Sequence, residues 1–256
     1  MIARTLQKLL GRAPASARSV PGGTRIYAVG DIHGRLDLLS ALVKRIEADR
    51  AGFGGAVEVV LLGDYIDRGP RSADVLDWLA AGLPDWATWT LLRGNHEQAM
   101  LDSIDGTGGQ PRLDAWLEYG GRETLRSYGV SARVALGNDR APIVAEMHAR
   151  VPAAHLALMR AMPLSRRIGD YLFVHAGIRP GVPMEQQEDR DLMWIRGEFL
   201  DCKDDHGCIV VHGHSITRDV TERPNRIGID TGAYATGRLT ALVLEGDTRR
   251  YMATDD

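Results

Sequence analysis

The sequence contains few cysteines and no long apolar run. Cys202 and Cys208 are the only cysteines among 256 residues, which excludes a framework of several disulfides and a zinc site built from cysteines. No apolar stretch approaches the roughly 20 residues that a membrane-spanning helix needs. The apolar patch near the start of the chain is too short for a secretory signal. We therefore expect a cytoplasmic protein that does not enter a membrane.

The sequence also lacks an excess of one charge. The formal net charge is −3, so the chain has no overall attraction for nucleic acid or anionic lipid, and we expect neither as a partner. Lysine occurs only as Lys8, Lys44 and Lys203, and the other basic residues are arginines. The planar guanidinium group suits two-point contact with phosphate, although a compositional bias of the genome would give the same pattern.

The composition that remains is that of an ordinary globular protein, with 44% hydrophobic and 25% charged residues. We expect a flexible tail over residues 1–22, followed by a single domain over residues 23–256. Within this domain, residues 97–165 have a mostly helical pattern that is interrupted at Gly120 and Gly121. We interpret this segment as a helical insertion rather than a separate domain.

Short apolar runs recur along the chain, and each ends at a polar residue. The runs RIYAVG, VEVVLLG, TWTLLRG, YLFV and CIVVHG have the length and composition of buried strands. Between the first two, Leu39, Leu42, Val43 and Ile46 have the spacing of an amphipathic helix, and a shorter apolar stripe precedes the third run. This alternation predicts an α/β core with parallel strands.

The residues that follow these runs are of types that bind metals. Ligands bind at the carboxyl ends of parallel strands because the loops converge there, and flanking glycines permit sharp turns close to a ligand. Carboxylate, amide and imidazole groups without thiolate favour Mn, Fe or Zn. In chain order the groups are Asp31 with His33; Asp64 with Asp67 and Arg68; Asn95 with His96 and Glu97; His175; and His214.

The motifs GDIHG, GDYIDRG, RGNHE, HAG and HGH match, in this order, those of the phosphoprotein phosphatase family of metallophosphoesterases. The resemblance covers roughly residues 24–246, and the phrases GGRETLRSYG and DLMWIR resemble the short bacterial and phage branch of that family. It implies a four-layer α-β-β-α fold, in which two mixed sheets pack face to face with helices outside. It also implies a site for two divalent metal ions, with Mn²⁺ the first choice and Fe or Zn the alternatives.

Carried over residue by residue, the resemblance implies a ligand set for each metal. A shared carboxylate reduces the repulsion between two dications that such sites hold ~3.5–4 Å apart, and a water held between them becomes hydroxide near neutral pH and attacks phosphorus in line. The implied ligands are Asp31 and His33 for one metal; Asn95, His175 and His214 for the other; and Asp64 as the bridge.

The resemblance also assigns roles to residues beside the metals. His96 resembles the family's general acid, which protonates the leaving alkoxide, and Asp67 resembles the carboxylate that keeps it protonated. Arg68 and Arg196 resemble the arginines that bind the phosphoryl group.

Two further residues of the RGNHE motif remain outside these roles. Arg93 either reaches the cleft or forms a surface ion pair. Glu97 is expected to favour the dipole at the start of a helix, with no catalytic role.

Three functions are compatible with these motifs. The first is a phosphomonoesterase for phosphoserine and phosphothreonine in proteins or peptides, with phosphotyrosine as a further substrate. The second is a symmetrical dinucleoside tetraphosphate hydrolase, a group that tends to carry alanine in place of Asp67 and aspartate in place of Glu97. The third is a regulatory protein with a degenerate site, but no ligand or catalytic position is lost here. The presence of Asp67 favours the first.

Overall fold

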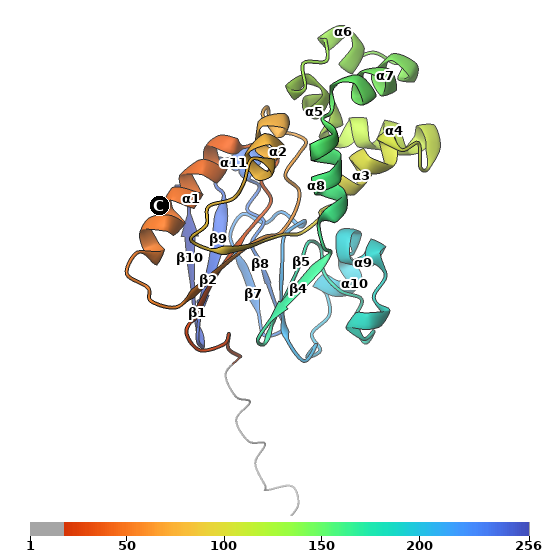
Figure 1. Ribbon diagram of the computed structural model, residues 1–256. Helices are drawn as coiled ribbons and strands as arrows, with labels where there is room; N and C mark the ends of the chain where they lie inside the picture. Colours follow the sequence, from red (N-terminus) through yellow and green to blue (C-terminus); the bar gives the residue numbers. More distant parts are fainter. Residues whose placement is uncertain (1–17, 256) are drawn as a thin grey trace, which may run out of the picture.

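The computed structural model describes residues 18–255. Two five-stranded sheets pack face to face, with helices on both outer sides (Figure 1). The first sheet has the order β10-β9-β1-β2-β3, formed by Thr248–Ala253, Thr240–Glu245, Thr24–Val29, Ala56–Leu61 and Thr88–Leu91. The second sheet has the order β4-β5-β6-β8-β7, formed by Ser165–Ile168, Tyr171–Val174, Ile209–His212, Arg226–Gly228 and Thr221–Arg223.

The alternation of side chains along the strands builds the layers. In β1, Ile26 and Ala28 belong to the apolar core between the sheets, whereas Tyr27 and Val29 pack on the outer side of the first sheet. Helices α1 (Leu36–Arg50) and α2 (Ser72–Ala80) cover that outer side with their buried stripes. Helices α9 (Asp189–Trp194) and α10 (Gly197–Leu200) pack on the outer side of the second sheet. The predicted four-layer fold is therefore confirmed.

A run of helices connects the two sheets. It contains α3 (Asn95–Ile104), α4 (Gly109–Trp116), a π-helical turn (Leu117–Gly121), α5 (Arg122–Ser127), α6 (Ala132–Ala135), α7 (Arg140–Arg150) and α8 (Ala153–Ala161). The break at Gly120 has a φ of 118°, which favours glycine. A Cβ atom there would lie 2.6 Å from the backbone nitrogen of Arg68, so the turn packs directly on the loop after β2. Two shorter helices lie among the later strands: Met184–Gln186 and α11 (Ala233–Thr236).

The tail predicted for residues 1–22 lies outside the described residues as far as residue 17. Residues 18–22 pack against the sheets: the backbone N–H of Val20 donates to Gly246, and that of Ser19 donates to the carboxylate of Asp170. Among residues 18–255, no helix combines the length and the apolar character that crossing a membrane requires.

The topology brings the predicted site residues to one end of the two sheets. Strands β1, β2 and β3 are parallel neighbours, so the loops that follow them leave the sheet at the same edge. Strands β5 and β6 are parallel neighbours in the second sheet, and His175 and His214 follow them. The Nδ1 atom of His175 lies 2.9 Å from the carbonyl oxygen of Leu62, which joins the two sheets at this end.

Replacing Phe173 with alanine tests the core between the sheets. Phe173 is fully buried there, and removal of a buried Phe side chain costs about 3–5 kcal/mol. We expect urea unfolding to show a loss of this size, whereas Leu136→Ala, at a side chain that is 58% exposed, changes the stability by less than about 0.5 kcal/mol. A loss below about 1 kcal/mol for Phe173→Ala would contradict this packing.

Candidate functional site

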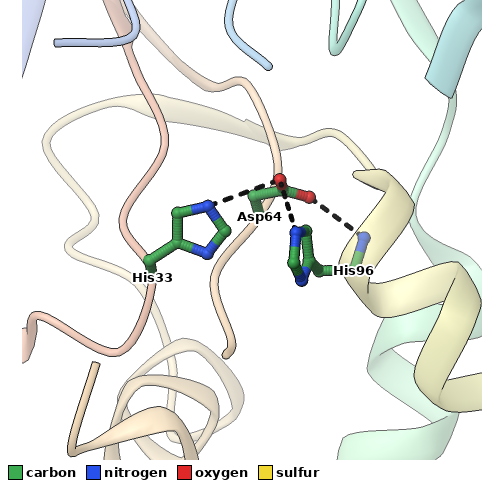
Figure 2. Close-up of side chains that lie close together, drawn as sticks. All are labelled: His33, Asp64 and His96. Atoms are coloured by element: carbon green, nitrogen blue, oxygen red, sulfur yellow. Dashed lines mark hydrogen bonds and ion pairs between the residues drawn. The ribbon is translucent and has the colours of Figure 1, made fainter. Parts of the chain in front are cut away.

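Asp64 lies at the centre of the site (Figure 2). It follows β2 and is buried, and its carboxylate oxygens lie 3.6 Å from Nε2 of His33, 3.7 Å from Nε2 of His96 and 3.4 Å from Nε2 of His175. Its side chain belongs to two buried groups whose donor atoms lie within 4.8 Å of one another. These groups are His33 with Asp64 and His96, and Asp64 with His175 and His214.

Backbone carbonyl groups orient two of the histidine rings. Nδ1 of His33 lies 2.8 Å from the carbonyl oxygen of Ile66, and Nδ1 of His175 lies 2.9 Å from that of Leu62. Because a carbonyl oxygen only accepts hydrogen bonds, each Nδ1 carries a proton, which leaves each Nε2 directed at the site as the atom that a metal would bind. Metal-binding histidines are oriented in the same way.

Asn95 brings a side-chain oxygen to the second group. Nε2 of His175 and Nδ1 of His214 lie 2.8 and 2.9 Å from the side-chain oxygen of Asn95. Burial alone would lower the pKa of His175, but the charge of Asp64 outweighs it and raises the pKa, so that the Nε2–H of His175 can donate to this oxygen. Burial, and then the charge of His175, lower the pKa of His214 to about 2, so that its ring stays neutral, as a metal ligand must. Asn95, His175 and His214 therefore fit a shared divalent ion.

Asp31 lies beside these groups but belongs to neither of them. Its carboxylate accepts the backbone N–H of His214 at 3.0 Å, and a Cβ atom at Gly213 would lie 2.0 Å from it, so only glycine allows this approach. Burial, then the charges of Asp230 and Asp64, raise the pKa of Asp31 well above its usual value. Buried carboxylates at such close quarters need a compensating cation. The charge of Asp31 therefore fits a metal site, although the structure places it next to His214 rather than within the His33 group.

His96 and Asp67 form a buried pair. Nδ1 of His96 lies 2.6 Å from Oδ2 of Asp67. Burial alone would lower the pKa of His96, but the charge of Asp64 and the hydrogen bond with Asp67 outweigh it, and the pKa lies above its usual value. His96 is thus suited to hold a proton at neutral pH.

The helical run holds Asp67 in place. Nε1 of Trp116 donates to Oδ2 of Asp67 at 2.9 Å, and the hydroxyl of Thr124 donates to Oδ1 at 2.6 Å. The backbone N–H of Asp67 donates to the hydroxyls of Ser72 and Thr124. Sequence reasoning missed Trp116 and Thr124, because they lie 49 and 57 residues beyond Asp67 and no local pattern connects them.

Arg68 and Arg196 line a common cavity of about 310 Å³ together with Asn95, His96 and His214. The guanidinium of Arg68 lies 3.0 Å from Nε2 of His33 and 3.1 Å from Nε2 of His96. It is therefore positioned to bind an anion next to both rings.

Arg93 does not line this cavity. It donates to the side chain of Gln98 and the carbonyl of Met162, so neither of the two roles expected for it describes its contacts.

Glu97 does more than the expected favourable interaction with the helix dipole. Its carboxylate accepts the backbone N–H groups of Asp64 at 2.9 Å, Tyr65 at 2.8 Å, Ile66 at 3.3 Å and Gly94 at 2.9 Å. Its place three residues after Gly94 is that of a capping box, which indicates the bond to Gly94 but not the bonds to the loop. Burial, and then the charge of Asp64, raise the pKa of Glu97 to about 7. Glu97 thus joins the start of α3 to the loop that carries Asp64.

The backbone is strained where the site residues lie. Among residues 18–255, the non-glycine residues with positive φ all belong to the predicted site. L-residues adopt this conformation rarely, and it persists where the surroundings enforce it, typically at functional sites. The residues are His33 (φ 45°), Asp64 (53°), Asp67 (72°), Arg68 (66°) and His214 (61°).

Comparison with known proteins identifies relatives of this chain. A family model of calcineurin-like phosphoesterases matches residues 24–241. The chain is 30% identical over 227 residues to serine/threonine-protein phosphatase 1 of Salmonella typhimurium, covering 84% of this chain and 89% of that protein. It is 35% identical over 97 residues to serine/threonine-protein phosphatase 2 of Escherichia coli, covering 38% of each chain.

The comparison also includes nucleotide hydrolases. A symmetrical bis(5'-nucleosyl)-tetraphosphatase of Aromatoleum aromaticum is 29% identical over 157 residues, which are 61% of this chain and 45% of that protein. The chain thus spans less than half the length of this relative and of the Escherichia coli phosphatase. A crystal structure of a candidate diadenosine tetraphosphatase has the same fold, with a TM-score of 0.61 and 21% identity over 93% of this chain and 98% of that one.

Glu97→Gln tests the clamp on the Asp64 loop, which is the set of four backbone N–H bonds that the carboxylate of Glu97 accepts. The amide keeps the shape of the side chain but removes the charge that four N–H groups bind. Supporting residues of this kind contribute about 10- to 100-fold to metal affinity, so we expect a loss of this order for Mn²⁺ in titration calorimetry. Glu118→Gln, at an exposed side chain of the neighbouring turn, serves as the control. Equal Mn²⁺ affinities of the two variants would show that the clamp does not support the site.

Proposed function

The chain belongs to the calcineurin-like phosphoesterase family, and from this premise we propose that it hydrolyses phosphoserine and phosphothreonine in proteins or peptides, with phosphotyrosine as a further substrate. The observation that carries the proposal is the buried pair of His96 and Asp67. A serine or threonine alkoxide is a poor leaving group and needs a proton, whereas the phosphate end of a nucleotide leaves without one. A histidine whose pKa is raised beside the metal ligands serves the first reaction.

The donor set of the site fits two divalent ions, and we propose Mn²⁺ first. Bound there, they would neutralise charge on the phosphoryl oxygens and lower the pKa of a bound water. Asp64 would hold the two ligand groups at a common centre. The proposed ligands are the residues assigned from the sequence: Asp31, His33, Asp64, Asn95, His175 and His214.

The remaining residues would orient the substrate and deliver the proton. Arg68 and Arg196 line the cavity beside the ligands and would bind the phosphoryl oxygens through their planar donor groups. Once Arg68 turns from the histidine rings to the phosphoryl group, Nε2 of His96 would be free to take up a proton from solvent, which its raised pKa favours, and to donate that proton to the leaving oxygen. Asp67 would hold the ring in position through Nδ1.

A dinucleoside tetraphosphate is the second candidate substrate. The relative from Aromatoleum aromaticum carries that activity in its name, and Trp194 and Tyr119 line the cavity with rings on which a base can stack. A purely regulatory role is disfavoured, because every position predicted to bind metal or transfer a proton retains a suitable side chain.

A substrate panel tests the proposal directly. Protein reconstituted with Mn²⁺ is given phosphoserine, phosphothreonine and phosphotyrosine peptides, and diadenosine tetraphosphate. We expect release of free phosphate from the peptides and loss of that activity in EDTA, with recovery when Mn²⁺ is restored. Formation of ADP from diadenosine tetraphosphate without phosphate release from any peptide would replace the proposal by the second candidate.

His96→Asn tests the proton donor. General acids contribute about 10²- to 10⁴-fold, so we expect kcat for a phosphoserine peptide to fall by this factor while the metal content is unchanged. With p-nitrophenyl phosphate the fall is smaller, because that leaving group needs less protonation. An equal fall for both substrates would remove His96 from this role.

Asp67→Asn tests how the acid is kept protonated. Asp67 raises the pKa of His96 through its hydrogen bond and its charge, and an acid loses activity as the pH rises through its pKa. The basic limb of the kcat profile should therefore move to lower pH in Asp67→Asn. Asp74→Asn, which changes an exposed carboxylate paired with Arg71, should leave the limb in place. An unmoved limb in Asp67→Asn would refute the coupling.

A further inference from the structure

The cavity beside the candidate metal site contains more positive charge than the phosphoryl group to be cleaved requires. Arg68, Arg112 and Arg196 line it, and none of the described residues in its lining is an aspartate or glutamate. The two metals that the proposed ligands would hold, together with Arg68 and Arg196, would already compensate the charge of one phosphoryl group. Arg112 lies in the helical run, on α4, and has no part in the proposed reaction.

Arg112 is held in an orientation that leaves its charge available. Its Nη2 atom lies 3.0 Å from Oδ2 of Asp102, and its guanidinium lies 5.4 Å from the ring of Trp194. The ion pair engages Nη2, and because a guanidinium group carries several further N–H donors, donors remain that can contact a ligand. The side chain is 38% exposed, so an incoming anion reaches it without rearrangement of the core.

Asp102 supports Arg112 from outside this cavity. Its side chain is only 12% exposed and also accepts a hydrogen bond from Gln98 at 2.7 Å. A carboxylate held in this way orients the guanidinium, yet an oxyanion in the cavity can bind the remaining donors at the same time. The arrangement is thus that of a pre-oriented cation at the edge of a substrate cavity.

The aromatic walls of the cavity indicate that more of the substrate than its phosphoryl group enters. Trp116, Tyr119 and Trp194 contribute to the lining, and Tyr119 is 66% exposed. A volume of about 310 Å³ is at the lower end of the range for ligand pockets. It accommodates the phosphorylated residue and a neighbouring group.

We propose that Arg112 is a second anion-binding residue of the substrate site, which selects substrates with a further negative group next to the phosphoryl group that is cleaved. The inference rests on the proposed function, under which this group is the carboxylate of an acidic residue that flanks the phosphorylated one. A second phosphate in a polyphosphate chain has the same chemistry, and the experiment separates the two sources.

The experiment compares two phosphoserine peptides of equal length, one with glutamate and one with glutamine on each side of the phosphoserine. For the unaltered protein we expect kcat/KM to be about 3- to 10-fold higher for the glutamate peptide, since the contact is partly exposed and therefore screened. In Arg112→Ala this ratio should fall to about 1. Arg190→Ala is the matched control, because Arg190 lines the adjoining cavity and not this one, and its ratio should stay that of the unaltered protein.

Asp102→Asn provides a second test that keeps the guanidinium. Removal of the carboxylate that orients the guanidinium should lower the ratio part of the way towards 1, and melting curves establish that each variant is folded. A ratio of 1 in the unaltered protein, or a ratio that survives Arg112→Ala, overturns the proposal.

The failure of the proposed function has a different signature. If no phosphopeptide is hydrolysed but diadenosine tetraphosphate is, the protein-phosphatase function is wrong. Arg112 then stands as an anion-binding residue if Arg112→Ala raises KM for the dinucleotide more than KM for p-nitrophenyl phosphate. An equal change for both rejects the anion-binding role as well.

Discussion

The mutual repulsion of buried carboxylates is the constraint on which the rest of the structure depends. Asp31 and Asp64 are buried close to Asp230, whose Oδ2 atom is buried without a hydrogen-bond partner. In water each would be solvated, whereas here histidine rings, an amide, backbone N–H groups and the nearby charge of Arg68 surround them. Such an arrangement is stable when cations compensate it. The four N–H bonds to Glu97 and the glycines that allow close approach are the means by which the fold keeps these groups together.

The helical run gives the site two things that the sheets do not supply. One is the pair of donors, Trp116 and Thr124, that hold Asp67 against His96. The other is the wall of the cavity, with Arg112 and Tyr119. The loops that follow the strands thus carry most of the proposed metal ligands. The run carries Asn95 and His96 at its start, and it also supplies the support for His96 and the wall of the cavity. We therefore expect changes in the run beyond its first turn to alter substrate preference without altering the proposed ligands.

The sequence predicted those parts of the molecule whose signal is local. The buried strands β1, β2, β5 and β6 are mostly apolar runs, and proposed ligands follow shortly after each of them. The edge strands β4 and β10 were missed, because SRRI and TRRYMA are polar and acquire strand structure only by pairing with a buried neighbour. The roles of Glu97, Trp116 and Thr124 depend on contacts between distant segments, which no spacing reveals. Arg93 belongs to the RGNHE motif, but its side chain contacts Gln98 and does not line the cavity.

The positive φ angles of the site residues limit how this scaffold can be stabilised. Each strained residue costs of order 1–3 kcal/mol, and replacement by glycine would relieve the strain at His33, Asp64, Asp67, Arg68 or His214. The five positions at which that relief is available are those to which the proposed chemistry is assigned. Selection for heat resistance would favour glycine at these positions. The resulting variants would have higher thermal stability but no activity. Engineering for durability should therefore leave the loops alone and work on the sheets and outer helices.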